Sequence, residues 1–174
     1  MTPSTGYSKR KATKVLTEFC ERNVIEHSMA VSEYAVEIAG KVRDSGREVD
    51  VDSVEIGALL HDIGRCKSHG IDHGIMGAKI LEKIPDLRGY SRYCLTHIGA
   101  GISREEALEL GLPPGDYIPS TLEEKIVAYA DNITEGCKKV DVSVTLEKMK
   151  KALGENHPAI ARVKELNDYI TPFL

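Results

Sequence analysis

The sequence predicts an all-α protein, and three observations support that fold class. Apolar residues recur at three- and four-residue spacing along most of the 174-residue chain, which is the period of an amphipathic helix. No segment has the strict two-residue alternation of a half-buried strand. No internal repeat is present either. We therefore expect roughly seven to nine helices in one domain that spans residues 1–174.

The first three helices follow from apolar stripes and end signals. We expect one helix over residues 9–22 and a longer one over about 24–44. Asp52 or Ser53 is then a suitable N-cap for a third helix, which carries the apolar run 54–60. This third helix ends where the first candidate functional residues begin.

The middle of the chain predicts shorter helices with recognisable caps. Asp72 is placed to cap a helix over 74–83, and a further helix is expected over 90–97. The segment 103–106 has the capping-box pattern and opens a short helix that ends at Gly111.

The last third of the chain begins with a loop rich in proline and glycine over 112–119. A second capping-box pattern at 120–123 opens the helix that carries Asp131. Two final helices are expected at about 143–153 and 158–170. The motif-bearing core therefore covers about 23–140, and 141–174 adds C-terminal helices.

Composition excludes several classes of protein. A net charge of -4 and a pI near 5.9 argue against an extended nucleic-acid surface. The four cysteines are widely spaced and form no CxxC pair, and no secretory leader precedes them, so we expect a cytoplasmic protein without disulfides. No run approaches the roughly 20 apolar residues of a membrane span.

His61-Asp62 is the most informative feature, because a polar pair directly follows an apolar helical run. Alone, the pair is compatible with simple helix capping. Four further residues of metal-ligating type lie at helix ends or on inward helix faces: His27, His73, His97 and Asp131. Together the six predict a metal site.

Four imidazoles and two carboxylates can hold two divalent ions if one carboxylate bridges them. Asp62 is the natural bridge, because its two oxygens can face different ions. We expect His27, His61 and Asp131 to complete one site with Asp62, and His73 and His97 to form the other.

Two metals a few ångströms apart activate a water and clamp the oxygens of a phosphoryl group. Phosphoester hydrolysis is therefore the expected reaction. Arg65, Lys67 and Arg104 lie near ligand-bearing segments and are candidate phosphate contacts, with Arg65 also a candidate catalytic residue. His69 is a loop residue or a substrate contact, and His157 is expected to cap a helix.

The segment His61-Asp62-Ile63-Gly64 resembles the HDIG motif of the HD-domain superfamily of metal-dependent phosphohydrolases, in particular its small stand-alone members. His27 in Glu26-His27-Ser28 resembles the first histidine of that superfamily. Asp131 in Ala130-Asp131-Asn132 resembles its last aspartate. The resemblance implies a helical bundle with a central metal site.

His73 and His97 resemble the two extra histidines of dinuclear members, some of which act on nucleotides. Two features depart from relatives. Arg65 stands where many have lysine, and the GYP signature of cyclic-di-GMP phosphodiesterases is missing. The resemblance therefore does not choose a substrate.

We expect a phosphohydrolase that cleaves a phosphomonoester or phosphodiester of a nucleotide or related small substrate, using hydroxide activated by two ions of Mn, Fe, Ni, Co or Mg. Two alternatives stay open. One is a di-iron oxygenase of the same fold, and the other is a non-catalytic regulatory module stabilised by metal. The sequence is compatible with a homodimer and predicts no membrane partner.

Overall fold

The structure, a computed structural model, describes residues 5–174, with side chains from Ser8 onward. Residues 1–4 of the expected domain lie outside the described part. Nine α-helices fill most of the described chain: α1 Thr5–Phe19, α2 Arg22–Asp44, α3 Val51–Leu60, α4 His73–Glu82, α5 Ser91–Thr96, α6 Arg104–Glu109, α7 Leu122–Asn132, α8 Val142–Leu153 and α9 Pro158–Ile170. The all-α prediction is confirmed.

Short elements complete the described chain. Three 3₁₀ helices are present: η1 Ile63–Cys66, η2 Arg88–Tyr90 and η3 Thr171–Phe173. A small antiparallel hairpin pairs β1 Thr134–Glu135 with β2 Lys138–Lys139. The hairpin was not predicted, because strands of two residues are too short to show a two-residue alternation.

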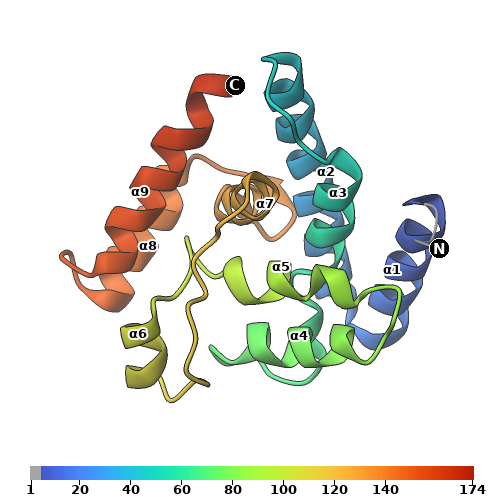
Figure 1. Cartoon of the computed structure of the whole chain (residues 1–174). Coiled ribbons are helices and arrows are strands. Elements are labelled where there is room, and N and C mark those ends of the chain that lie inside the picture. The colour runs from blue at the N-terminus through green and yellow to red at the C-terminus, as the bar shows by residue number, and fades with distance from the viewer. Residues whose placement is uncertain (1–4) are drawn as a thin grey trace.

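Helix α7 occupies the middle of the molecule. In Figure 1 it is seen end-on, with α2 and α3 on one side and α8 and α9 on the other, while α4 and α5 lie below. It packs against α2, α3, α5 and α9. The central position explains why five consecutive residues of α7, from Ile126 to Ala130, are all buried.

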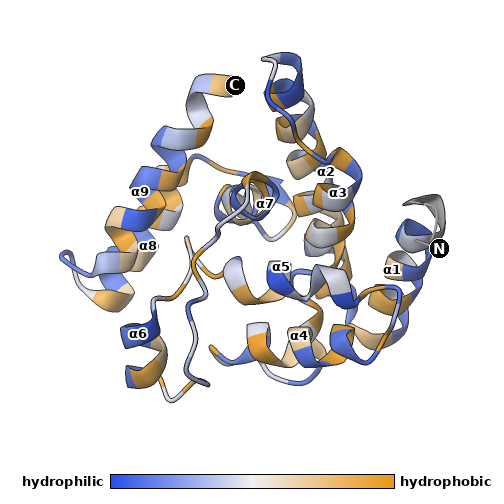
Figure 2. Cartoon of the chain, viewed as in Figure 1, coloured by the Kyte–Doolittle hydropathy of each residue, from blue (hydrophilic) through white to orange (hydrophobic). Residues whose placement is uncertain are grey.

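Two large apolar clusters hold the helices together. One joins α2, α3, α7 and α9 around Ile38, Ile126 and Val163. The other joins α1, α3, α4 and α5 around Leu60 and Leu81. Most helices carry hydrophilic and hydrophobic residues on different sides (Figure 2), as expected of amphipathic helices that turn one side inward.

Helix ends differ from expectation in a few places. The N-cap of α3 is Asp50, whose side chain accepts from the Ser53 N–H, so neither Asp52 nor Ser53 caps that helix. Asp72 precedes α4 but makes no capping bond, because its Oδ1 accepts from Ser68 Oγ at 2.5 Å. In α7 the cap is Thr121.

Other end signals agree with the structure. Ser103 and Glu106 form the reciprocal capping box expected at α6. His157 caps α9, where its Nδ1 accepts from the Ala159 N–H at 3.2 Å. Gly154 ends α8 with a φ of 91°, a conformation that favours glycine. No helix in the described part is both long and apolar enough to cross a bilayer.

Candidate metal centre

Four histidines and two aspartates meet where five helices converge. Nearly all of them stand at helix ends, where the backbone turns and side chains from different helices can approach one another. His27 lies on α2, His61 is the C-cap of α3, Asp62 precedes η1, His73 opens α4, His97 is the C-cap of α5, and Asp131 lies on α7. The structure therefore brings all six expected ligand residues together.

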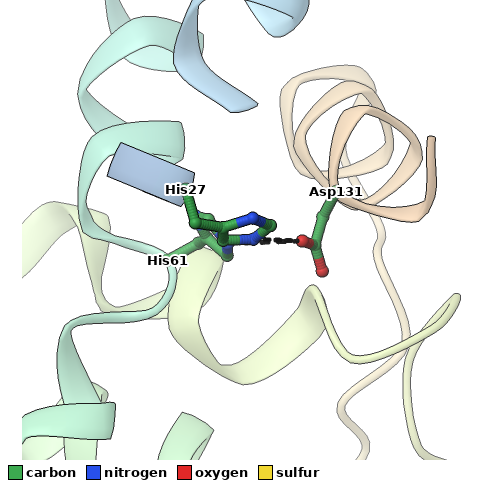
Figure 3. Close-up of side chains that lie close together, drawn as sticks. All are labelled: His27, His61 and Asp131. Carbon is green, nitrogen blue, oxygen red and sulfur yellow. Dashed lines mark hydrogen bonds and ion pairs between the residues drawn. The ribbon is translucent and has the colours of Figure 1, made fainter. Parts of the chain in front are cut away.

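The outer part of the cluster contains His27, His61 and Asp131 (Figure 3). The Nε2 atom of His27 lies 2.9 Å from Oδ1 of Asp131, and Nε2 of His61 lies 3.5 Å from the same oxygen. The His27 and Asp131 side chains are 18% and 22% exposed, whereas His61 is fully buried. Solvent therefore reaches the cluster at its His27 and Asp131 edge.

The inner part contains His73 and His97. Each presents Nε2 to Oδ1 of Asp62 at 3.2 Å, and the two nitrogens are 3.0 Å apart. The other oxygen of Asp62, Oδ2, lies 3.9 Å from Nε2 of both His27 and His61. The two oxygens of one carboxylate thus face different pairs of histidines.

All four imidazoles are oriented by their other ring nitrogen. Each Nδ1 lies within hydrogen-bond distance of a backbone carbonyl, which can only accept, so Nδ1 carries a proton and, in the neutral imidazole, Nε2 offers a lone pair. The partners are Gly136 O at 2.6 Å for His27, Ala58 O at 2.6 Å for His61, Gly70 O at 2.8 Å for His73 and Cys94 O at 2.8 Å for His97.

The lone pairs and carboxylate oxygens fit bound cations. Nε2 of His61 and Oδ1 of Asp62 are buried without a hydrogen-bond partner, although an unpaired buried polar atom is costly. Nε2 atoms of His73 and His97 face each other beside that same oxygen. Imidazole nitrogens and carboxylate oxygens that converge in this way are the ligands that first-row divalent metals prefer.

His61 lies close to both parts of the cluster. The atoms of His27, His61 and Asp131 that could bind metal lie within 4.8 Å of one another, and so do those of His61, Asp62 and His97. From the sequence, we expect His61 to serve only the ion held by His27, Asp131 and Asp62. In the structure its ring lies between the rings of His27 and His97, at centroid distances of 5.5 and 4.8 Å.

Burial and charge shift the pKa values of the cluster. Burial alone would raise the pKa of Asp62, but the surrounding His61, His73 and His97 outweigh it and hold that pKa far below its usual range. Asp131 is lowered in the same way by His27 and His61. Both carboxylates are therefore ionised and able to bind a cation at neutral pH.

The pKa values of His61 and His97 move in opposite directions. Burial opposes a charge on His61, yet Asp62 and Asp131 overcome that effect and raise its pKa to about 9. Burial lowers the pKa of His97. Nε2 of His61 lies 3.5 Å from Oδ1 of Asp131 and 3.9 Å from Oδ2 of Asp62, and these two negative charges favour its charged form.

Gly64 explains how η1 and α4 approach closely enough to place His73. A Cβ atom added at Gly64 would lie 1.8 Å from the carbonyl oxygen of His73 and 2.5 Å from the backbone nitrogen of Gly77. Only glycine permits this contact, because neither obstructing atom belongs to a flexible side chain. The close packing brings the start of α4 beside Asp62.

A hollow of about 330 Å³ opens beside the exposed edge of the cluster. Arg65 lines it and donates from Nε to Oδ2 of Asp62 at 2.8 Å. His69 lies in the wall as well. The full lining is Asn23, Val24, His27, Asp62, Arg65, His69 and Gly136.

The other two expected phosphate contacts are placed differently. Lys67 is exposed and Arg104 is exposed at the start of α6, and neither lines the hollow. The turn at Gly99 and Gly101 carries the chain away from His97 before α6 begins, so nearness in sequence does not bring Arg104 to the cluster.

The hairpin contributes a contact that the sequence did not predict. Gly136 adopts a φ of 61° in the two-residue loop between the strands, and its carbonyl accepts from His27. A glycine in a two-residue loop is a known hairpin signal, but β1 and β2 are too short to support it. The other carbonyl groups that accept from the histidines belong to Ala58, Gly70 and Cys94, and no side-chain pattern in the sequence marks them.

Comparisons with known proteins agree with the motif and the fold. An uncharacterised protein of Methanocaldococcus jannaschii is 52% identical over 164 residues, which cover 94% of this chain and 97% of that protein. The HD domain of the L. monocytogenes phosphodiesterase PgpH superposes with a TM-score of 0.53 at 18% identity, covering 92% of this chain and 95% of that domain.

Some relatives are longer proteins, and this chain matches only part of each. A tRNA (cytidine(56)-2′-O)-methyltransferase of Thermoplasma volcanium is 40% identical over 148 residues, which cover 85% of this chain but 42% of the enzyme. The corresponding methyltransferase of Picrophilus torridus is 44% identical over 118 residues, which cover 68% of this chain and 34% of that enzyme. The chain therefore spans less than half of either enzyme.

The family comparison covers the whole metal cluster. The HD domain family model matches residues 24–136, a range that includes the first and last candidate ligands, His27 and Asp131. The match extends over more than half of the chain. This protein therefore belongs to the HD-domain family.

Proposed function

We propose that this protein is a metal-dependent phosphohydrolase that cleaves a phosphomonoester or phosphodiester bond of a nucleotide, with two divalent ions at the cluster. Membership of the HD-domain family supports a metal-dependent phosphohydrolase in general terms. The observation that carries the finer proposal is the position of Asp62, whose two oxygens face separate pairs of histidines.

The ligand residues have distinct roles in this proposal. Asp62 would hold both ions, Asp131 and His27 would hold the one at the exposed edge, and His73 and His97 would hold the buried one. His61 stands between them. Ions held there would lower the pKa of a water and neutralise charge on a phosphoryl group.

Arg65 is proposed to bind the substrate phosphate. Arg65 lines the hollow, and its Nε donates to Oδ2 of Asp62. The guanidinium therefore lies beside the cluster and also faces the open hollow. A guanidinium can donate two parallel hydrogen bonds to a phosphate, and Nε is the only donor used by Asp62. The remaining donors are available to a substrate.

An RNA end is a second candidate substrate, and the names of relatives favour it. Two relatives are tRNA methyltransferases by name, and a Ribonuclease Y of Thermosipho melanesiensis is 29% identical over 164 residues, covering 87% of this chain and 28% of that protein. The net charge of -4 disfavours a long RNA on the surface. A short or terminal phosphodiester agrees with both observations.

The proposal is tested by metal analysis of the purified protein and by a substrate panel. The panel contains nucleoside monophosphates, linear and cyclic dinucleotides, a 5′-phosphorylated and a 3′-phosphorylated oligoribonucleotide, and bis(4-nitrophenyl) phosphate. Each is assayed with Mn, Fe, Ni, Co or Mg under air and without oxygen.

We expect two ions per chain and oxygen-independent turnover with at least one redox-inert metal. Turnover that requires both iron and oxygen would instead establish the di-iron oxygenase. Full metal loading without turnover of any phosphoester would favour a regulatory module.

A further inference from the structure

His69 lines the hollow of about 330 Å³ beside the metal cluster, together with Arg65 and two candidate metal ligands, His27 and Asp62. It belongs to the loop between η1 and α4 and is exposed to solvent. Its side chain makes no hydrogen bond or ion pair with any residue in the described part of the chain. The imidazole of His69 is therefore free to contact a substrate in the hollow.

The loop around His69 is held by hydrogen bonds on both sides of that residue. On the preceding side, Oγ of Ser68 donates to Oδ1 of Asp72 at 2.5 Å. On the following side, the N–H of Gly70 donates to Oγ of Ser68 at 3.1 Å, and the carbonyl of Gly70 accepts from Nδ1 of His73 at 2.8 Å. Because His73 is a candidate metal ligand, these bonds tie the backbone at His69 to the cluster itself.

The side chains that line the hollow differ in their ability to give a proton. The pKa of Asp62 is held far below its usual range by the neighbouring histidines, so this carboxylate has no proton to give. Arg65 stays charged, because a guanidinium does not lose its proton in proteins. His27 uses both ring nitrogens, Nδ1 toward a backbone carbonyl at 2.6 Å and Nε2 toward Asp131 at 2.9 Å. Among the lining residues, His69 is left as the titratable side chain whose nitrogens are uncommitted.

Hydrolysis of a phosphoester requires such a proton donor when the departing group is an alcohol. The bond that breaks leaves negative charge on the oxygen of that group, and an alkoxide oxygen is strongly basic, so a proton supplied as the bond breaks lowers the barrier. Histidine changes its charge between about pH 5 and 8, so it can give a proton and regain one. The exposure of His69 lets solvent return the proton after each turnover.

We propose that His69 is the general acid of the reaction and protonates the oxygen of the leaving alcohol. This inference rests on the proposed phosphohydrolase function and adds a catalytic residue to it. The oxygen of a water forms a bond to phosphorus while the bond from phosphorus to the leaving oxygen breaks. The His69 imidazolium gives its proton to that oxygen, the attacking water loses a proton to solvent, and solvent reprotonates His69. The products are the free alcohol and the hydrolysed phosphate.

Two other roles for His69 lead to different expectations. As a second phosphate contact beside Arg65, its side chain would stabilise the bound substrate regardless of the leaving group. As a further metal ligand, its removal would lower the metal content. The candidate ligand groups disfavour the second role, because His69 is absent from both sets of side chains whose ligand atoms lie within 4.8 Å of one another.

The test compares two kinds of leaving group with the metal-loaded full chain. A nucleoside monophosphate is compared with 4-nitrophenyl phosphate, and a dinucleotide is compared with the 4-nitrophenyl ester of its nucleotide. The sugar oxygen of the natural ester is strongly basic and needs a proton, whereas 4-nitrophenolate is a weak base and departs without one. A general acid therefore matters for the first kind of ester and hardly at all for the second.

His69→Gln keeps a polar side chain but cannot transfer a proton, and Ile71→Gln is its matched control. Ile71 is exposed in the same loop and does not line the hollow. We expect His69→Gln to lower kcat about 100-fold or more with the sugar ester and less than about threefold with the 4-nitrophenyl ester. KM for both esters should stay within about twofold. Ile71→Gln should keep both activities, and elemental analysis should find the wild-type metal content in both variants.

Several outcomes would overturn the role of His69 and leave the phosphohydrolase function standing. They are an equal fall in kcat with both kinds of ester, a rise in KM without a fall in kcat, and loss of metal in His69→Gln. A wild-type protein that cleaves only 4-nitrophenyl esters would also contradict it, because no acid would then assist an alcohol. Absence of turnover with every phosphoester would instead remove the proposed function, and the role of His69 with it.

Discussion

At the scale of single residues, the proposed centre depends most on Asp62. Its oxygens lie 3.2 Å from the Nε2 atoms of His73 and His97 and 3.9 Å from those of His27 and His61. Asp62→Asn keeps the size of the side chain but exchanges one carboxylate oxygen for an NH₂ group, which cannot bind a cation. We expect loss of at least one ion per chain by elemental analysis, and a fall in activity of more than about 100-fold.

Asp52→Asn is the matched control for Asp62→Asn. Asp52 is exposed in the first turn of α3, the helix that ends just before Asp62. This control should keep both ions and full activity. Two ions and normal turnover in Asp62→Asn would contradict the bridging role, provided that circular dichroism shows the same helix content in both variants.

Arg65 and Lys67 allow a second comparison at the residue scale. Arg65 lines the hollow beside the cluster, whereas Lys67 is exposed and does not line it. We expect Arg65→Gln to raise KM for a phosphoester about 10-fold or more, because a charge-assisted hydrogen bond to the phosphate is lost. Lys67→Gln should change KM by less than about 2-fold.

Metal content separates two roles of Arg65. If Arg65 binds substrate, Arg65→Gln keeps both ions, and Arg65→Lys restores part of the affinity because the charge returns. If Arg65 acts only by holding Asp62 in place, Arg65→Gln loses metal, and KM rises as a consequence. An equal effect of Lys67→Gln would move the phosphate site away from Arg65.

At the scale of elements, the contact between η1 and α4 depends on Gly64. Gly64→Ala would drive a Cβ against the backbone of His73 and Gly77, so the two elements must separate. We expect destabilisation of about 2 kcal/mol or more in urea unfolding, together with weaker metal binding through the displaced His73.

Gly40→Ala is the opposite control within the same fold. A Cβ at Gly40 meets nothing within 4 Å, and Gly40 lies inside α2. Alanine there should stabilise the protein by about 0.5–1 kcal/mol, because glycine is a poor residue inside a helix. The same substitution at Gly64 should therefore have the opposite sign, and equal signs would contradict the close-contact interpretation.

The elements also explain which features could be predicted from sequence. The helices were predictable because caps and apolar spacing are local, as at Ser103 and Pro158. The hairpin was not, because its strands have two residues each and its role depends on a backbone carbonyl at Gly136. Arg104 was expected to contact phosphate but does not line the hollow. Its position in the sequence could not show in which direction the turn after α5 sends the next helix.

At the scale of the whole molecule, the ligand residues come from helices that are distant in sequence. His27 and Asp131 are separated by 104 positions, yet they meet because α2 and α7 pack through the same apolar cluster. The sequence could predict the identities of the ligands from their residue types. It could not predict the place of His61 between both parts of the cluster, which depends on how α2, α3 and α5 pack.

We expect this arrangement to make the stability of the molecule depend on metal. Without ions, Nε2 of His61 and Oδ1 of Asp62 stay buried and unpaired where five helices meet. A ligand that binds only the folded protein stabilises it by about 2.7 kcal/mol when its concentration is 100 times its dissociation constant. Since about 2–4 °C of Tm corresponds to each kcal/mol in a chain of this size, removal of one ion should lower Tm by roughly 5–10 °C.

The last prediction is measured by calorimetric unfolding before and after chelation and after the metal is restored. Wild-type protein should lose about 5–10 °C per ion and recover it on reloading. Asp62→Asn should respond less, because it retains fewer ions, while Asp52→Asn should respond like the wild type. A Tm unchanged by chelation, with elemental analysis confirming that the ions were removed, would contradict the idea that buried unpaired ligands make the helix junction depend on metal.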